Sequence, residues 1–123
     1  MANQVVWFDL PVKDVDRAVR FYSAVLGGSP TKHEMPGMKL AVLPHGEKDV
    51  SGCLVQAGAG NMTQPTQDGA LLYFDCQGRL DEAIAAAEKN QGKVLQPKHS
   101  IAPHSFRALV LDSEGNRIAL HSM

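Results

Sequence analysis

Two stretches of this chain, residues 14–28 and 79–93, are similar copies of one unit separated by 65 positions. Shifting the first copy onto the second aligns Val15, Asp16, Ala18, Val19 and Gly27 with Leu80, Asp81, Ala83, Ile84 and Gly92. Each copy follows an apolar, strand-like run and ends in glycine. Internal repetition of this kind predicts two similar modules within one fold.

The first copy sits in a recognisable order of elements. Alternating residues over 4–10 predict a strand that Pro11 ends. Asp14 is a suitable N-cap for a helix that stops at Gly27-Gly28. Three short strands are then expected at about 30–35, 38–44 and 51–57.

The second copy repeats this order after a polar linker at 58–69. A strand is expected at 70–76 and a helix at 80–90, which Gly92 ends. Strands near 93–97, 106–111 and 117–122 complete the unit. The predicted fold class is therefore α+β. One domain over 1–123 contains two βαβββ modules, about 4–57 and 70–122.

Composition excludes several classes of function. Lys+Arg 12 against Asp+Glu 13 gives a net charge of −1, so no basic surplus points to nucleic acid. No signal peptide and no apolar run long enough to span a bilayer is present in the sequence. We therefore expect a cytoplasmic protein with neither nucleic acid nor membrane as a partner. Cys53 and Cys76 are expected to be reduced core thiols, although a disulfide stays open.

Two segments carry a resemblance to a known family. LPVKDVDRAVRFYSAVLGG (10–28) resembles the first strand–helix segment of the vicinal oxygen chelate superfamily, and DSEGNRIAL (112–120) resembles its terminal hairpin. The superfamily includes glyoxalase I, bleomycin-resistance proteins and extradiol dioxygenases. The resemblance implies a glyoxalase/bleomycin resistance/dioxygenase fold, in which two modules form a curled mixed sheet around a central cup.

The same resemblance implies a divalent metal bound by four positions in that cup. These positions fall on Trp7, Leu71, Ala119 and a residue near Leu54, or Cys53 if the register shifts by one. Divalent metals bind imidazole, carboxylate or thiolate groups, and only Cys53 offers one of these. We therefore predict no metal at the superfamily position and no cofactor, unless the ligands have been relocated.

Other residues are candidates to line the cup and bind a small organic molecule. The set is Trp7, Asp9, Tyr73, Asp75, His99, His104, Arg107 and His121.

Each candidate has a plainer alternative. Trp7 would stack on a ring or simply fill the core, and Asp9 and Asp75 would form a carboxylate pair or be two solvated strand ends. Arg107 would bind a carboxylate or pair on the surface.

The histidines divide into surface and cup candidates. His99 and His104 are expected in a loop bordering the cavity, where with His121 they could instead form a relocated metal site. His33 and His45 are expected at the surface.

These observations predict a small-molecule binding protein or a metal-independent enzyme that forms a homodimer. A metal-dependent lyase or dioxygenase and a non-catalytic structural dimer remain alternatives. The alternation also predicts a register, in which the following residues pack toward the helices: Val6, Phe8, Leu10, Leu72, Phe74, Ile118 and Leu120.

Overall fold

The computed structural model describes residues 3–58 and 63–123, and these form two modules of the same design. The first contains β1 (Trp7–Val12), α1 (Val15–Leu26), β2 (Thr31–Met35), β3 (Met38–Val42) and β4 (Ser51–Gln56). The second contains β5 (Leu72–Asp75), α2 (Leu80–Lys89), β6 (Lys93–Ala102), β7 (Ser105–Leu111) and β8 (Arg117–Ser122). The predicted α+β class and the βαβββ repeat are confirmed.

Each module forms its own four-stranded mixed sheet. The strand order is β1-β4-β3-β2 in the first sheet and β5-β8-β7-β6 in the second. In both, the strand before the helix pairs in parallel with the last strand of its module, and the other pairs are antiparallel. The sheets are not closed into one barrel, so β1 and β5 each remain an edge strand.

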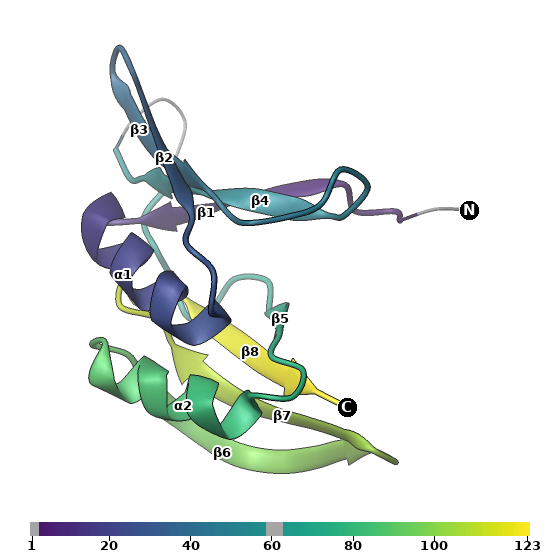
Figure 1. Ribbon diagram of the computed structural model, residues 1–123. Coiled ribbons are helices and arrows are strands. Elements are labelled where there is room, and N and C mark those ends of the chain that lie inside the picture. Colours follow the sequence, from purple (N-terminus) through teal and green to yellow (C-terminus); the bar gives the residue numbers. More distant parts are fainter. Residues whose placement is uncertain (1–2, 59–62) are drawn as a thin grey trace.

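The two helices lie side by side between the two sheets (Figure 1). α1 contacts β3 and β4, α2 contacts β6, β7 and β8, and the helices contact each other. One hydrophobic cluster therefore serves both modules, with Phe21 and Tyr22 of α1 packed near Phe74 of β5. Burial of these aromatic rings stabilises the contact between the modules.

The predicted register is confirmed at six of its seven positions. Phe74, Ile118 and Leu120 are in the core, and Phe8, Leu10 and Leu72 pack against it. The expectation for Val6 was wrong, because this side chain is 73% exposed. The ladder with β4 begins only at Trp7, so Val6 precedes the sheet and no helix covers it.

Two predicted strand ends were also wrong. Pro11 does not end the first strand, which continues to Val12. A proline is tolerated there because β1 is an edge strand with a single neighbour. β6 is longer than expected and runs through His99 to Ala102, so the expected loop around His99 is part of a β-hairpin with β7.

The second helix ends slightly differently from its prediction. α2 stops at Lys89 with Asn90 as its C-cap, and Gln91 rather than Gly92 has a positive φ, 72°. α1 ends as expected, because Gly27 adopts the left-handed conformation with a φ of 79°. Within the described ranges, no helix is long and apolar enough to cross a membrane.

The DSEGN turn between β7 and β8 binds the two modules together. Glu114 accepts hydrogen bonds from the backbone N–H groups of Lys13 and Asp14, at 2.9 and 2.8 Å. Its carboxylate also forms a salt bridge with Arg17 at 2.7 Å. The turn of the second module therefore holds the start of α1 in the first module, and it has a structural role.

Asp112 of the same turn is buried and strongly hydrogen-bonded. It accepts from the Tyr22 hydroxyl at 2.6 Å and from the backbone N–H of Asn116 at 2.9 Å. Burial raises the pKa of Asp112, and these hydrogen bonds oppose that rise. The contact fixes the middle of α1 against the second sheet.

Candidate functional site

Each sheet has one face on the shared core and one face that points outward. Along β5, Leu72 and Phe74 point inward, so Tyr73 and Asp75 point outward. The same alternation places Trp7 and Asp9 on the outward face of the first sheet. The predicted cup residues are therefore on outward faces.

The outward face of the second sheet brings four candidates together. Arg107 of β7 pairs across the sheet with His99 of β6 and with His121 of β8. Its Nε donates a hydrogen bond to His99 Nε2 at 3.0 Å, and its Nη1 donates to the Tyr73 hydroxyl at 2.5 Å. We call Tyr73, His99, Ser105, Arg107 and His121 the arginine cluster.

The hydrogen bonds of His99 define its tautomer. Nδ1 lies 2.8 Å from the carbonyl oxygen of Pro97, and a carbonyl can only accept. The proton is therefore on Nδ1, and the unprotonated Nε2 accepts from Arg107. His99 thus supports Arg107 as an uncharged acceptor.

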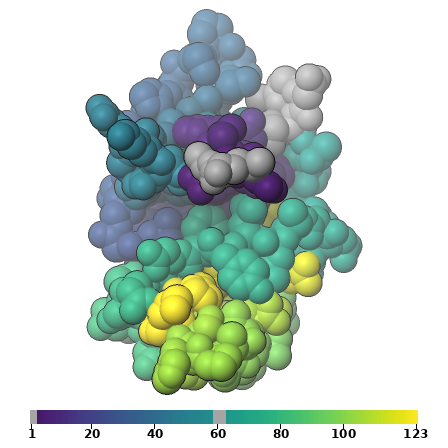
Figure 2. Space-filling view, turned by 90° about the vertical axis from the view of Figure 1, so that its right-hand side faces the viewer, coloured from purple at the N-terminus to yellow at the C-terminus, as the bar shows by residue number. Residues whose placement is uncertain are grey.

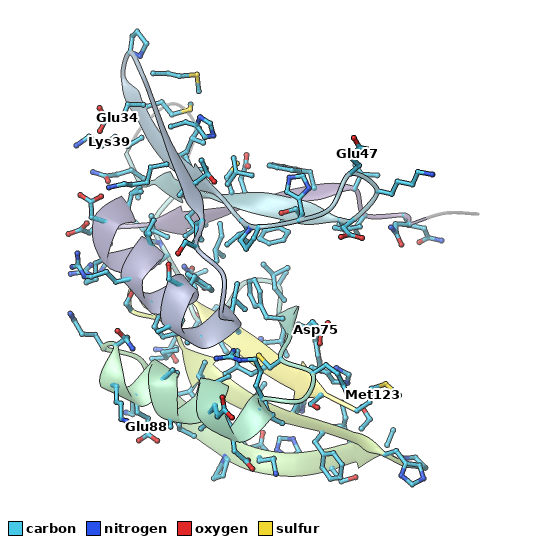
Figure 3. All side chains as sticks on the ribbon, viewed as in Figure 1. Glu34, Lys39, Glu47, Asp75, Glu88 and Met123 are labelled. Atoms are coloured by element: carbon cyan, nitrogen blue, oxygen red, sulfur yellow. The ribbon has the colours of Figure 1, made fainter. Side chains whose placement is uncertain are left out.

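His121 forms the other half of the cluster. Its Nε2 lies 2.8 Å from the Ser105 hydroxyl, and its ring is 6.1 Å from the ring of Tyr73. Asp75 lies beside His121 in the parallel pairing of β5 with β8, and it accepts a hydrogen bond from the backbone of Gln77. In Figure 3, Asp75 lies toward the same end of the second sheet as the C-terminal Met123, away from the helices.

His104 does not join this cluster. It occupies the turn between β6 and β7 with a φ of 60°, and it is exposed. His33 and His45 are exposed as predicted, although His45 contacts the edge of Trp7 with ring centroids 6.1 Å apart.

The outward face of the first sheet carries a smaller group around Trp7. The Trp7 indole N–H donates to Asp9 at 3.2 Å, and Cys53 of β4 lies opposite Asp9 in the pairing of β1 with β4. Burial raises the pKa of the Cys53 thiol, and the charge of Asp9 raises it further. This thiol is therefore a poor nucleophile at neutral pH.

These two outward groups do not meet within one chain. The sheets turn their inner faces to the same core, so Trp7 and Asp9 are on the outward face of the first sheet and the arginine cluster is on the outward face of the second. Asp9 and Asp75 consequently do not form a carboxylate pair within the chain, and each accepts a local hydrogen bond. Trp7 is 42% exposed and so is not a core filler.

A groove separates the edges of the two sheets on the side opposite the helices. Its volume is about 460 Å³, and its lining includes Val5, Phe8, Val50 and Tyr73. Figure 2 views this side, with the first module (purple to blue) above and the second (green to yellow) below. Exposed apolar side chains thus surround the edge strands β1 and β5.

The residues at the superfamily's metal positions do not fit a divalent ion. Trp7, Leu71 and Ala119 carry no metal-binding group. Leu54 lies in the core, so the outward residue at the fourth position is Cys53, a single soft ligand. Among the described residues, no three His, Cys, Asp or Glu side chains converge on a point, and the suggested set of His99, His104 and His121 does not assemble.

Sequence reasoning missed one member of the arginine cluster. Ser105 precedes Arg107 by two residues on β7 and therefore shares its face, a relation that alternation could have predicted. Because residues 98–105 were expected to form a loop, alternation along a strand was not applied to Ser105.

Comparison with known proteins identifies the family of the chain. The model of the Glyoxalase/Bleomycin resistance protein/Dioxygenase superfamily matches residues 4–120. No curated protein matches the sequence.

Solved structures show the same fold. A glyoxalase/bleomycin resistance protein from Albidiferax ferrireducens T118 is 18% identical, with a TM-score of 0.68 over 98% of this chain and 99% of that one. The trypanothione-dependent glyoxalase I of Leishmania major is 21% identical, with a TM-score of 0.69 over 98% and 87%. A glyoxalase I mutant from Zea mays is 18% identical with a TM-score of 0.73, over 94% of this chain and 44% of that one.

Proposed function

Because this chain belongs to the Glyoxalase/Bleomycin resistance protein/Dioxygenase superfamily, we propose that it binds a small organic molecule without a metal ion. The ligand lies against the outward face of the second sheet. One observation carries the proposal: five polar or aromatic side chains from four different strands or their junctions converge there as the arginine cluster. The proposal concerns binding only, and it applies equally to a protein that sequesters the molecule and to an enzyme that converts it.

The cluster has the composition of a binding site. Small-molecule sites combine apolar or aromatic surface with a few polar groups that fix orientation. Tyr73 supplies an aromatic surface that is 49% exposed, and Arg107 and His121 supply polar groups held by partners. The residues at the superfamily's metal positions lack the groups that bind a divalent ion, which supports a ligand bound by side chains alone.

We further propose a homodimer in which the site gains a second wall. In one chain, Trp7 and the arginine cluster are on the outward faces of two different sheets. A twofold arrangement can place Trp7 of one copy opposite Tyr73 of another, and C₂ symmetry is the usual form of self-association. The cup that the family fold implies would then form between chains.

A thermal-shift screen of diverse metabolites in excess EDTA tests the binding proposal. We expect at least one compound to raise the melting temperature, because the cluster needs no metal. Tyr73→Ala should abolish the shift, since the ring and the hydroxyl that holds Arg107 are both lost. Phe106→Ala is the matched control, because Phe106 is an exposed aromatic residue on the neighbouring position of β7 and points to the other face.

Metal analysis of protein purified without chelators decides between the alternatives. Stoichiometric metal, together with ligand binding that EDTA abolishes, would contradict the proposal and favour a relocated metal site. An absence of both metal and ligand would favour a structural dimer.

A further inference from the structure

Arg107 is a fixed cation whose charge is not neutralised. Its hydrogen bonds go to His99 Nε2 and to the Tyr73 hydroxyl, and both are uncharged acceptors. None of the salt bridges among the described residues includes Arg107. The side chain is thus held in one place while its positive charge remains available on the outward face.

The unused donors of Arg107 suit an oxyanion. A guanidinium has five N–H donors, and two are used here, one on Nε and one on Nη1. The three that remain are all on Nη1 and Nη2. Two terminal N–H groups in one plane match the two oxygens of a carboxylate, which explains the frequency of bidentate arginine–carboxylate pairs.

The surroundings of this cation favour a flat organic group. The Arg107 guanidinium carbon lies 5.9 Å from the centroid of the Tyr73 ring, and the His121 ring lies 6.1 Å from the same ring. Ala119 pairs with Tyr73 across β5 and β8 and is fully buried, so the apolar surface available to a ligand here is that of the Tyr73 ring. A ring bonded to a carboxylate would therefore meet aromatic and apolar surface while its charge meets Arg107.

A second arginine makes this face positive on balance. Arg117 alternates with the core residue Ile118 along β8 and so points to the outward face with Ala119 and His121. Its Nε is buried and has no hydrogen-bond partner within the described part of the chain. Two arginines face one carboxylate, Asp75, whose Oδ1 already accepts a backbone hydrogen bond.

We propose that the ligand of the arginine cluster is an aromatic carboxylate, whose two oxygens are bound by Nη1 and Nη2 of Arg107. This inference rests on the proposed binding function and narrows it to one chemical class. Tyr73 and His99 are positioning residues for the guanidinium, and the Tyr73 ring also contacts the ligand.

Benzoate and benzamide separate charge from shape, because they differ only in the carboxylate. In NMR titrations of ¹⁵N-labelled protein, benzoate should shift backbone resonances of β7 and its neighbours β6 and β8, and benzamide should bind at least about 10-fold more weakly. Arg107→Gln should weaken benzoate binding about 10- to 100-fold, the effect of losing a charge-assisted bidentate pair. Arg107→Lys should recover only part of that loss, since a lysine keeps the charge without the planar donor pair.

Arg20→Gln is the matched control, because Arg20 is an exposed arginine on α1, outside the cluster. It should leave benzoate binding unchanged, and the ¹⁵N spectra of all variants report whether they fold. Inorganic phosphate serves as an anion without a ring, and we expect it to bind more weakly than benzoate.

Three results would overturn the inference: no benzoate binding, equal binding of benzoate and benzamide, or full binding by Arg107→Gln. Phosphate binding as tight as benzoate would overturn the aromatic part of it. A neutral compound from the EDTA screen that still requires Tyr73 would leave the proposed function standing while this inference fails.

Discussion

At the scale of single residues, Glu114 shows how a charged side chain becomes part of the interior. Its side chain is fully buried, yet it is paired with Arg17 and receives two backbone N–H groups and the Ser113 hydroxyl. Burial alone would raise the pKa of Glu114, but hydrogen bonds from Arg17, Ser113 and Asp14 together lower it. The ionised carboxylate is therefore the form that the fold stabilises.

Glu114→Gln should lower the free energy of unfolding by about 2–4 kcal/mol, because it leaves Arg17 facing an amide in a buried site. Urea unfolding followed by circular dichroism measures the change. Glu88→Gln is the control, since Glu88 is exposed on α2 (Figure 3), and it should change stability by less than about 0.5 kcal/mol.

The comparison of the wild type with Glu114→Gln also leads to a prediction about how stability depends on pH. A carboxyl group with a lowered pKa in the folded state stabilises the fold above its unfolded pKa, about 4.3 for glutamate, and that stabilisation is lost as the pH falls through the folded value. The stability difference between the wild type and Glu114→Gln should therefore be full at neutral pH and shrink below about pH 4. The raised pKa of Asp112 acts in the opposite direction but is present in both proteins, so it largely cancels. A difference that stays constant down to pH 2 would contradict this account of Glu114.

Much of the residue-level detail followed from alternation along strands. The outward positions of Tyr73, Asp75 and Arg107 follow from a period of two once the strands are placed. The contact between Glu114 and the start of α1 joins residues 97 to 101 positions apart, and nothing in the local sequence pattern encodes it. The residues of the DSEGN segment predict only a turn, because turn propensity is local and tertiary hydrogen bonds are not.

At the scale of elements, Arg79 connects the two modules through a helix end. Its guanidinium donates to the carbonyl oxygens of Ala24 and Val25, in the last turn of α1. These carbonyls have no partners within their own helix, and the C-terminal end of a helix dipole favours a positive charge. The residue that precedes α2 thus caps α1.

Arg79→Ala should destabilise the protein by about 1–2 kcal/mol, because both carbonyls lose their donor and the helix dipole loses its cation. Thermal unfolding should show a lower melting temperature than that of the wild type. Arg20→Ala removes an arginine from the exposed side of α1 and should have little effect. Equal effects of the two substitutions would mean that Arg79 contributes only surface charge.

Element boundaries were predictable where local chemistry determines them. Asp14 caps α1 by accepting from the Arg17 backbone, and Gly27 ends it, both as the sequence indicated. The length of β6 was not predictable from its own residues, since Pro97 and Ser100 are typical of loops. Pairing with β7, which includes register shifts around these residues, extends the strand to Ala102.

At the scale of the whole molecule, two modules of similar sequence place their helices together, and the sheet faces that carry Trp7 and the arginine cluster both point outward. The repeat predicted the two modules and the βαβββ order of their elements along the chain, and the family fold is confirmed. How the modules face each other is set by the shared core around Phe21, Tyr22 and Phe74, which alternation along individual strands does not specify. A cup that contains both Trp7 and Tyr73 therefore requires a second chain.

The proposed homodimer is a prediction about the edge strands and the groove between them. Val5 and Tyr73 line this groove and are 62% and 49% exposed, and Val6 and Trp7, which follow Val5 in the chain, are 73% and 42% exposed. Exposed apolar side chains gathered in this way usually mark an interaction site. Light scattering at micromolar concentration should give twice the 13.3 kDa mass of one chain. Val6→Glu should shift the protein to the monomer, because it introduces a charge at the proposed interface without touching the core.

Met35→Glu provides the comparison for that shift. Met35 is 51% exposed, but it lies at the turn between β2 and β3, and this hairpin extends away from β5 (Figure 1). Both substitutions add the same charge at an exposed apolar position, so only the location differs. If the interface surrounds the groove, Met35→Glu should stay dimeric and bind the ligand as the wild type does. Val6→Glu should become monomeric and bind the ligand more weakly, because Trp7 of the second copy no longer closes the site. A wild-type mass of one chain, or equal dissociation of both variants, would contradict the proposed dimer interface around the groove.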